Sequence, residues 1–285
     1  MPTTLTTGTL TAPGAALHYQ IRGAGPMLLI SQSGEGDADR TTDLAARLAG
    51  AYTVITYDRR GLSRSRLDTP ECGATLTEHA EDVHHLLASL TDSPALMLGC
   101  SLGAVIGLHT AVRHPGQIRT LIAHEPVAPR LLPDVERAHH EHELAALQDL
   151  YLREGLGVTL PEIARTLGID PTSRDTEPDL TPQPMNARRK ANFDYFIRHD
   201  FTAIIHDTLD ITALQSTGTH IIPAAGRATP RTVFDHQCAT SLAAQLDREL
   251  QELPGGHNGN TSHPRAYATR IRELLTTVDG RRRAE

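Results

Sequence analysis

Short apolar runs and longer amphipathic stretches take turns along most of this chain. Apolar runs of strand length occupy residues 27–31, 52–57, 95–98, 118–123, 220–224 and 249–253. Amphipathic stretches of helical length occupy residues 39–48, 76–90, 232–246 and 264–275. Alternating residues at 7–11 and 16–22 flank Pro13-Gly14, which predicts a hairpin. Strands that alternate with helices predict an α/β fold in which helices cover both faces of a mainly parallel sheet.

The alternation is interrupted between residues 129 and 200. This stretch is polar, helical in pattern and punctuated by proline, with a loop expected over residues 170–184. We therefore expect a core formed by residues 1–128 and 201–285, with residues 129–200 inserted as a helical cap. An insert with proline and glycine breaks suits a movable lid that sets substrate choice.

The sequence Gly-Cys-Ser-Leu-Gly at residues 99–103 lies between an apolar strand and an apolar helix. Gly-x-Ser-x-Gly at such a junction is typical of a nucleophile elbow, a sharp turn that lifts the Ser101 hydroxyl clear of the sheet. Gly99 and Gly103 leave the room that the turn requires, and the positive end of the helix favours the negative charge of acyl-transfer intermediates. Together with Gly107, these glycines also match a spacing found in membrane helix dimers. We reject that alternative because the run is short and contains polar residues.

The composition is that of an ordinary water-soluble protein and narrows the function classes. Of the 285 residues, 39% are hydrophobic and 21% are charged, and the net charge of -7 argues against a nucleic-acid binder. The cysteines Cys72, Cys100 and Cys238 are odd in number and lack metal-ligand spacing, which indicates a reducing cytoplasm. We recognise no export signal at the N-terminus, and the single lysine beside many arginines indicates a GC-rich bacterial genome. Histidines and glutamates cluster at 136–143 without His-Glu-x-x-His spacing, which favours a solvated polar helix over a zinc site.

Three motifs together support a family resemblance. They are the Tyr-Asp-Arg-Arg-Gly turn at 57–61, the elbow at 99–103 and the late Gly-Gly-His at 255–257. Over residues 8–275 the chain resembles the α/β-hydrolase superfamily, especially its small, cap-bearing esterases and haloperoxidase-like bacterial members. The resemblance implies a mostly parallel eight-stranded sheet, a helical cap after the sixth strand, and a site that requires no metal ion or organic cofactor.

The resemblance also suggests roles for individual residues. Ser101 is the candidate nucleophile, and a serine hydroxyl requires a base within hydrogen-bonding reach. His257 fits the position of that base in the loop after the last strand, and His263 is its rival. The oxyanion hole would use the backbone N–H groups of Leu102 and Ser33. The family often has His-Gly in the second of these loops, whereas this chain has Gln32-Ser33; the Gln32 side chain either adds a donor or caps the loop.

The acid of the triad is missing from its usual place. The family usually carries an aspartate in a Gly-x-Asp pattern after the seventh strand, but Ala228 stands there. The next carboxylate, Asp235, is expected on the following helix. Glu125, at the end of the sixth strand, occupies the other position from which relatives supply the acid; alternatively it braces the cap entrance. Losing the orienting acid of a serine triad costs up to ~10⁴ in kcat. Either Glu125 therefore replaces the aspartate, or the reaction tolerates the loss, as hydrolysis of an activated ester, thioester or lactone or a proton-transfer step would.

Three functions remain open from the sequence. The first is a hydrolase of small or medium carboxylic esters, lactones or thioesters that works through an acyl-enzyme. The second is a non-hydrolytic cyclase, lyase or dehydratase of secondary metabolism, in which His257 acts as a general base. The third is a non-catalytic ligand-binding relative. In each case the expected partner is a small molecule, without nucleic acid or membrane, and the sequence leaves the oligomeric state open.

Overall fold

A computed structural model describes residues 4–69 and 73–282, with side chains described up to residue 277, so Cys72 lies outside the described residues. The strands are β1 Leu5–Ala12, β2 Ala15–Arg22, β3 Met27–Ser31, β4 Thr53–Tyr57, β5 Arg66–Leu67, β6 Ala95–Cys100, β7 Ile118–His124, β8 His220–Gly226 and β9 Gln251–Leu253. The helices are α1 Thr42–Leu48, α2 Leu76–Leu90, α3 Leu102–Arg113, α4 Asp134–Glu154, α5 Leu156–Thr166, α6 Ala187–Tyr195, α7 Phe201–Ile205, α8 Ile211–Ser216, α9 Phe234–Gln245, α10 Gly259–Ser262 and α11 Pro264–Arg282. A 3₁₀ turn spans Pro129–Leu131 (η1), and a π-helix spans Phe196–Asp200 (η2).

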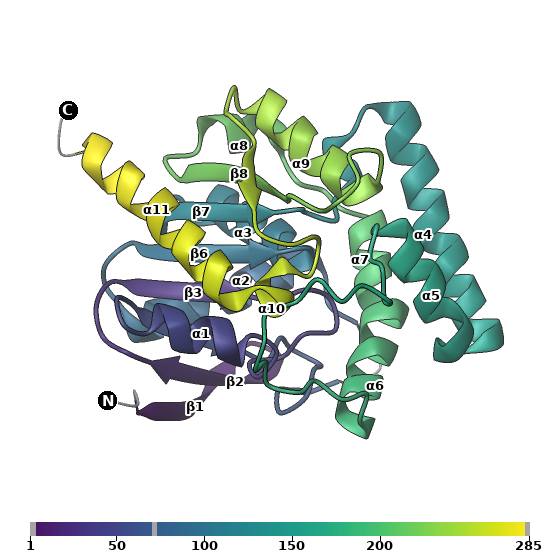
Figure 1. Cartoon of the computed structure of the whole chain (residues 1–285), viewed down its shortest axis with the longest axis horizontal. Helices are drawn as coiled ribbons and strands as arrows, with labels where there is room; N and C mark the ends of the chain where they lie inside the picture. Colours follow the sequence, from purple (N-terminus) through teal and green to yellow (C-terminus); the bar gives the residue numbers. More distant parts are fainter. Residues whose placement is uncertain (1–3, 70–72, 283–285) are drawn as a thin grey trace.

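The strands form one sheet in the order β1-β2-β4-β3-β6-β7-β8-β9 (Figure 1). The β1–β2 hairpin joins the sheet through an antiparallel pairing of β2 with β4, and the pairs from β4 to β9 are parallel. The eight strands of this path match the expected number. The described residues add a ninth strand outside this path, because the two-residue β5 pairs with β2.

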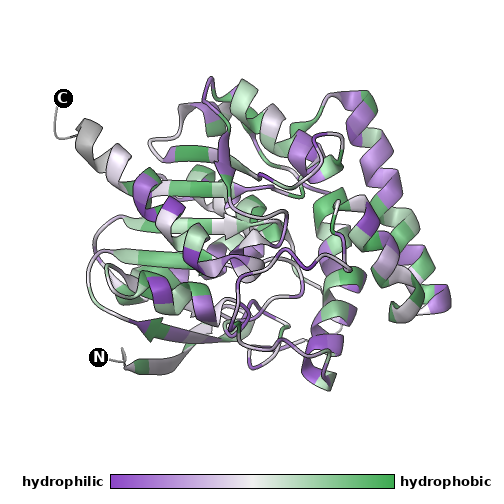
Figure 2. Cartoon of the chain, viewed as in Figure 1, coloured by the Kyte–Doolittle hydropathy of each residue, from purple (hydrophilic) through white to green (hydrophobic). Residues whose placement is uncertain are grey.

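Alternate residues of the central strands face two separate hydrophobic cores. In β3, Leu28 and Ile30 pack in a core with residues of α1 and α11, whereas Leu29 packs in a core with residues of α2 and α3. Successive side chains of a strand point to opposite faces, so an apolar run without polar gaps is what a sheet covered on both faces requires. Figure 2 accordingly shows the central strands as mostly hydrophobic.

The helices α4 to α7, joined by loops, lie together at one end of the sheet (Figure 1). They follow β7 and precede β8 in the chain. A side chain at Gly61, in the loop after β4, would collide with the ring of Tyr195, and one at Gly34, after β3, would collide with the ring of Phe196. This helical block therefore packs on the loops that follow the carboxyl ends of the strands, where parallel α/β sheets carry their sites.

The α4 helix is polar over much of its length (Figure 2). In the described part of the chain, no helix is both long enough and apolar enough to cross a membrane. The cysteines Cys100 and Cys238 are buried as free thiols.

Candidate active site

Ser101 lies between β6 and α3 in a backbone conformation that side chains rarely adopt. Its φ is 56° and its ψ is -120°, which for a residue other than glycine costs about 1–3 kcal/mol and is typical of functional sites. The turn closes because its flanks lack side chains. A Cβ at Gly99 would lie 2.5 Å from the Gly103 carbonyl oxygen, and one at Gly103 would lie 2.1 Å from the Ser31 carbonyl oxygen.

Glu125 directly follows the neighbouring strand β7 and is strained in the same way, with a φ of 43°. Its backbone N–H donates to the Ala224 carbonyl at 2.9 Å, and its Oε1 accepts the Gly226 N–H at 2.7 Å. The Ser101 N–H bonds to the carbonyl of His124, the residue before Glu125, at 2.9 Å. The chain therefore fixes the nucleophile candidate and this carboxylate at the ends of adjacent strands.

His257 lies in the loop after β9 and is buried beside these strand ends. Its Nδ1 is 2.8 Å from Glu125 Oε2, so the structure brings together the two residues that the sequence paired. Its Nε2 is buried without a hydrogen-bond partner among the described residues, and the Ser101 hydroxyl therefore does not bond to it here. Catalytic hydrogen bonds are often long in the absence of substrate.

The rival histidine faces elsewhere. His263 Nδ1 lies 2.9 Å from Ser262 Oγ, and its Nε2 lies 3.3 Å from Asp175 in the loop before α6.

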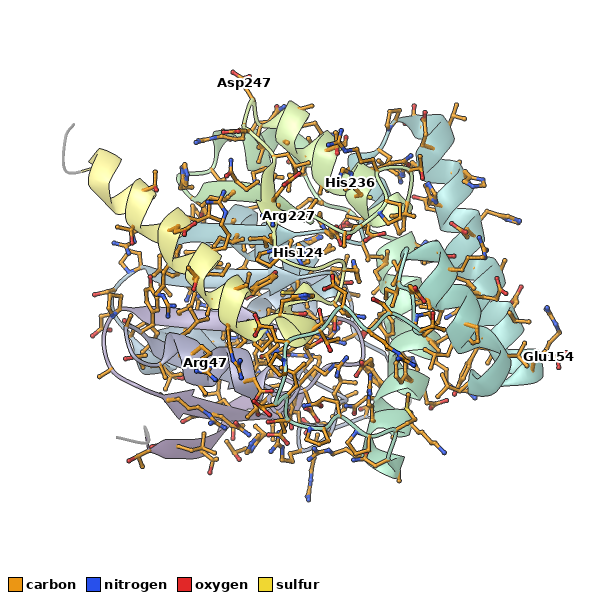
Figure 3. The ribbon with its side chains drawn as sticks, viewed as in Figure 1. Arg47, His124, Glu154, Arg227, His236 and Asp247 are labelled. Carbon is orange, nitrogen blue, oxygen red and sulfur yellow. The ribbon has the colours of Figure 1, made fainter. Side chains whose placement is uncertain are left out.

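His124 lies near the middle of the molecule in Figure 3, whereas Glu154 and Asp247 are at its periphery. The His124 ring centroid is 6.4 Å from that of His257, and its nitrogens have no hydrogen-bond partner among the described residues.

Asp235 is the residue of this cluster that the sequence did not assign. It belongs to α9, as expected, yet its Oδ2 lies 2.7 Å from His257 Nδ1. The fold class offers a signal that could have identified Asp235 as a site residue. A helix that follows a parallel strand begins near the carboxyl edge of the sheet, so an acid in its first turn can reach a site at that edge.

Burial and charge act against each other in this cluster. Burial raises the pKa of Asp235 to about 6, although His257 favours its ionised form. Burial also opposes ionisation of Glu125, but His124 and His257 outweigh it and hold the pKa of that carboxyl well below its usual range. For His257, burial favours the neutral ring, yet the charges and contacts of Asp235 and Glu125 prevail and raise its pKa.

The raised pKa of His257 predicts the pH dependence of activity. A general base must be neutral, so its activity is lost as the pH falls through its pKa. We expect the acidic limb of kcat/KM to have its midpoint above 6.5, the ordinary value for histidine. A pH–rate profile with an activated ester measures this limb, and a midpoint below 6.5 would contradict the electrostatics described above.

The two candidate oxyanion donors come from different segments, Leu102 from the start of α3 and Ser33 from the loop after β3. Leu102 is the first residue of α3, where a helix leaves its N–H groups unpaired. Neither the Leu102 N–H nor the Ser33 N–H donates to a protein group among the described residues. The Gln32 amide nitrogen donates to the Thr41 hydroxyl, so this side chain caps its own loop instead of adding a donor.

Arg59 holds the loop that carries Ser33. Its guanidinium donates to the Ser33 carbonyl oxygen at 2.9 Å and also to the Gly34 carbonyl oxygen. It forms a buried ion pair with Asp200 of η2 at 2.7 Å, and Asp200 in turn contacts His79 at 3.1 Å. The sequence identified the motif that contains Arg59 but did not predict this role.

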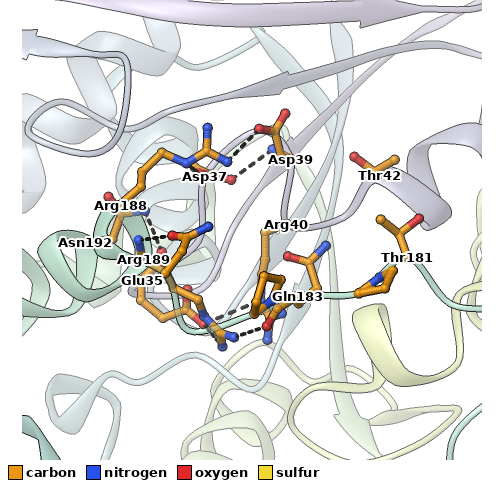
Figure 4. A pocket seen from close by; sticks show the side chains of 13 residues that line it. Glu35, Asp37, Asp39, Arg40, Thr42, Thr181, Gln183, Arg188, Arg189 and Asn192 are labelled. Atoms are coloured by element: carbon orange, nitrogen blue, oxygen red, sulfur yellow. Dashed lines mark hydrogen bonds and ion pairs between the residues drawn. The ribbon is translucent and has the colours of Figure 1, made fainter.

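A polar cavity of about 320 Å³ separates the loop after β3 from α6 and the segment before it (Figure 4). Its charges are paired across the gap. Arg189 of α6 lies 2.8 Å from Glu35, and Arg188 lies 3.0 Å from Asp39. These ion pairs join α6 to the Ser33 loop at a second place.

The histidine-rich start of α4 brings three possible metal ligands together. His139, His140 and Glu143 have ligand atoms within 4.8 Å of one another, with His139 exposed. His140 already contacts Glu143 at 3.0 Å and stacks on the Phe234 ring at 4.5 Å. His140 therefore already has a hydrogen-bonding partner and a packing partner in this structure.

A mostly parallel sheet with a strained serine and a carboxylate at the ends of adjacent strands, and a buried histidine in the loop after the last strand, is the arrangement of α/β-hydrolase enzymes. A model described as the alpha/beta hydrolase family matches residues 28–270. This chain belongs to that family and is an enzyme of the hydrolase class.

Individual proteins give the same result. The chain is 38% identical to the uncharacterized hydrolase YraK of Bacillus subtilis (strain 168), over 95% of this chain and 97% of the relative. It is similar in fold to a thermophilic esterase from Thermogutta terrifontis, with a TM-score of 0.73 and 19% identity over 96% of this chain and 99% of the other. It is also similar to Est816, described as an N-acyl homoserine lactone degrading enzyme, with a TM-score of 0.70 and 21% identity over 95% and 99%.

Proposed function

We propose that this protein is a serine hydrolase that cleaves a small or medium carboxylic ester, lactone or thioester through an acyl-enzyme. One observation carries the proposal: Ser101 sits strained at the head of α3, and the strand next to its own is directly followed by Glu125, the carboxylate that holds the buried His257. Strain of this kind persists where the surrounding structure positions a reacting group.

The first half-reaction follows from these positions. His257 Nε2 takes the Ser101 proton as Oγ attacks the substrate carbonyl carbon. The carbonyl electrons move to its oxygen, which accepts the N–H groups of Leu102 and Ser33. The intermediate collapses as His257 gives the proton to the leaving oxygen or sulfur. Glu125 stabilises the imidazolium and keeps the proton of the neutral ring on Nδ1.

The second half-reaction repeats these roles with water. His257 takes a proton from water, the hydroxide attacks the acyl carbonyl, and Ser101 leaves with the proton returned by His257. In this proposal the helices α4 to α7 cover the substrate, and their packing on the Ser33 loop supports it. Substrate choice would then depend on this block.

A fluorophosphonate tests the proposal without knowledge of the natural substrate. The probe phosphonylates a serine only where a base and an oxyanion hole activate it. We expect a single adduct on Ser101, located by peptide mass spectrometry, together with hydrolysis of short p-nitrophenyl esters. A wild-type protein that forms no adduct and cleaves none of these esters would refute the proposal and favour the non-hydrolytic use of His257.

A further inference from the structure

Two carboxylates approach the same nitrogen of His257. Glu125 Oε2 lies 2.8 Å from Nδ1, and Asp235 Oδ2 lies 2.7 Å from it. The two acids come from different parts of the fold, the end of β7 and the first turn of α9. A serine triad needs one acid at this place, so the second carboxylate requires an explanation.

Asp235 is not a solvated surface charge. Its side chain is fully buried, like that of Glu125. Neither of its oxygens has a hydrogen-bonding donor among the described residues. Its 2.7 Å approach to His257 Nδ1 is an ion-pair contact, and the hydrogen bond of that nitrogen is to Glu125. An uncompensated buried carboxylate is strongly destabilising, so the imidazole is the partner that makes this position tolerable.

The position from which the family usually supplies the acid lies close to the His257 loop, but alanine occupies it in this chain. Ala228 lies in the loop after β8, and its N–H donates to the Gly255 carbonyl at 2.9 Å, two residues before His257. A carboxylate at Ala228 would therefore have been close to the histidine loop. In this chain the carboxylate arrives instead from α9, seven residues further along the sequence.

We propose that Asp235 is a second positioning residue for His257, so that either Asp235 or Glu125 alone suffices to orient the imidazole. The inference rests on the proposed function, because it assigns the support of the same base. With both acids present, Nδ1 keeps its proton and Nε2 is left for Ser101. With Asp235 replaced by its amide, Glu125 still accepts the Nδ1–H. With Glu125 replaced, Asp235 Oδ2, which lies 2.7 Å from Nδ1, takes over as the acceptor.

The variants Glu125→Gln, Asp235→Asn and the double variant test this redundancy. The readout is the rate of fluorophosphonate labelling of Ser101, supported by kcat and KM for a p-nitrophenyl ester. We expect each single variant to keep its labelling rate within about 10-fold of wild type, and the double variant to lose ~10³–10⁴-fold, as when a triad loses its acid. The loss should fall on kcat, with KM little changed.

A rescue separates the carboxylate role from a structural one. Ala228→Asp in the double variant restores an acid at the usual place, and we expect it to recover at least about 10-fold of the lost rate. Ala228→Asn is the matched control, with the same size and no charge. Equal rates for the two triple variants would overturn the proposal, because packing alone would then explain the loss.

The Nδ1–H proton gives a readout that needs no reaction. In proton NMR it resonates far downfield when a carboxylate holds it, and His257→Gln identifies the signal by its loss. We expect the signal in both single variants and not in the double variant. If Glu125→Gln alone abolishes the signal and costs as much as the double variant, Asp235 plays no part and the proposal is wrong.

Failure of this proposal is distinguishable from failure of the proposed function. If the wild-type protein forms no Ser101 adduct, the acyl-enzyme is refuted while the NMR signals still decide on Asp235. If the double variant does not fold, as judged by circular dichroism, Glu125→Gln alone remains decisive. A labelling loss of ~10³-fold in that single variant would show that Asp235 cannot replace Glu125.

Discussion

Ser101→Ala should remove at least ~10³-fold of the acyl-transfer activity, because no neighbouring group can supply the attacking alkoxide. The substitution deletes one hydroxyl and leaves the elbow in place, since alanine adds no atom beyond Cβ. The decrease is measured as kcat/KM for a p-nitrophenyl ester, and fluorophosphonate labelling should disappear. Circular dichroism and thermal unfolding should match the wild type.

Ser262→Ala is the matched control for that experiment. Ser262 lies beside the rival histidine, and its hydroxyl contacts His263 Nδ1 at 2.9 Å. If His263 were the base, this serine would be its natural nucleophile. We expect Ser262→Ala to keep its full rate. A Ser101→Ala protein that retains most of its activity would exclude a covalent mechanism at Ser101 and leave His257 as a general base only.

The sheet was predictable because its central strands are short and largely buried. Every apolar run predicted as a strand overlaps a strand of the structure, from β3 at Met27–Ser31 to β9 at Gln251–Leu253. Their ends were less predictable, because local hydrogen bonds decide them. The helix expected from residue 39 begins at Thr42, since the Asp39 side chain accepts the Gln20 amide at 2.6 Å and the chain turns before α1.

The site was predictable where the sequence itself carries the geometry. A nucleophile elbow is a local turn, so Gly-x-Ser-x-Gly located Ser101 directly. Asp235 could not be assigned in this way, because its contact with His257 depends on how α9 packs on β8 beside the loop after β9, and that is a tertiary property. The same holds for Arg59, whose partner Asp200 is 141 residues away in the chain.

Arg59→Met should reduce both stability and activity, because one buried guanidinium serves two purposes. Its side chain is 1% exposed and its ion-pair partner Asp200 is fully buried. Removing one member of a buried pair leaves an uncompensated charge and costs about 3–5 kcal/mol of the free energy of unfolding. The Ser33 and Gly34 carbonyls also lose their donor, so the loop that offers the Ser33 N–H is released.

The neighbouring arginine provides the matched control. Arg60 is 5% exposed and bonds to Asp82 through two nitrogens, each at 2.6 Å. Among the described residues, its hydrogen bonds and ion pairs involve Asp82, Glu78 and Pro13 and not the Ser33 loop. We expect Arg60→Met to lower the free energy of unfolding by a similar ~3–5 kcal/mol while the labelling rate of Ser101 changes little. Urea unfolding measures the free energy of unfolding. Fluorophosphonate labelling measures the reactivity of Ser101, at a temperature where both variants are folded.

A double substitution separates the two purposes of Arg59. In Arg59→Met with Asp200→Leu, both charges of the ion pair are removed, and replacing a buried ion pair by apolar residues is often neutral for stability. His79 loses its 3.1 Å contact with Asp200 in this variant. We expect the double variant to recover most of the lost stability. Its labelling rate should nevertheless remain ~10²–10³-fold below wild type, the cost of losing one oxyanion donor, because neither side chain can bond to the Ser33 carbonyl. A double variant that regains both stability and labelling rate would show that Arg59 stabilises the fold without positioning the Ser33 loop.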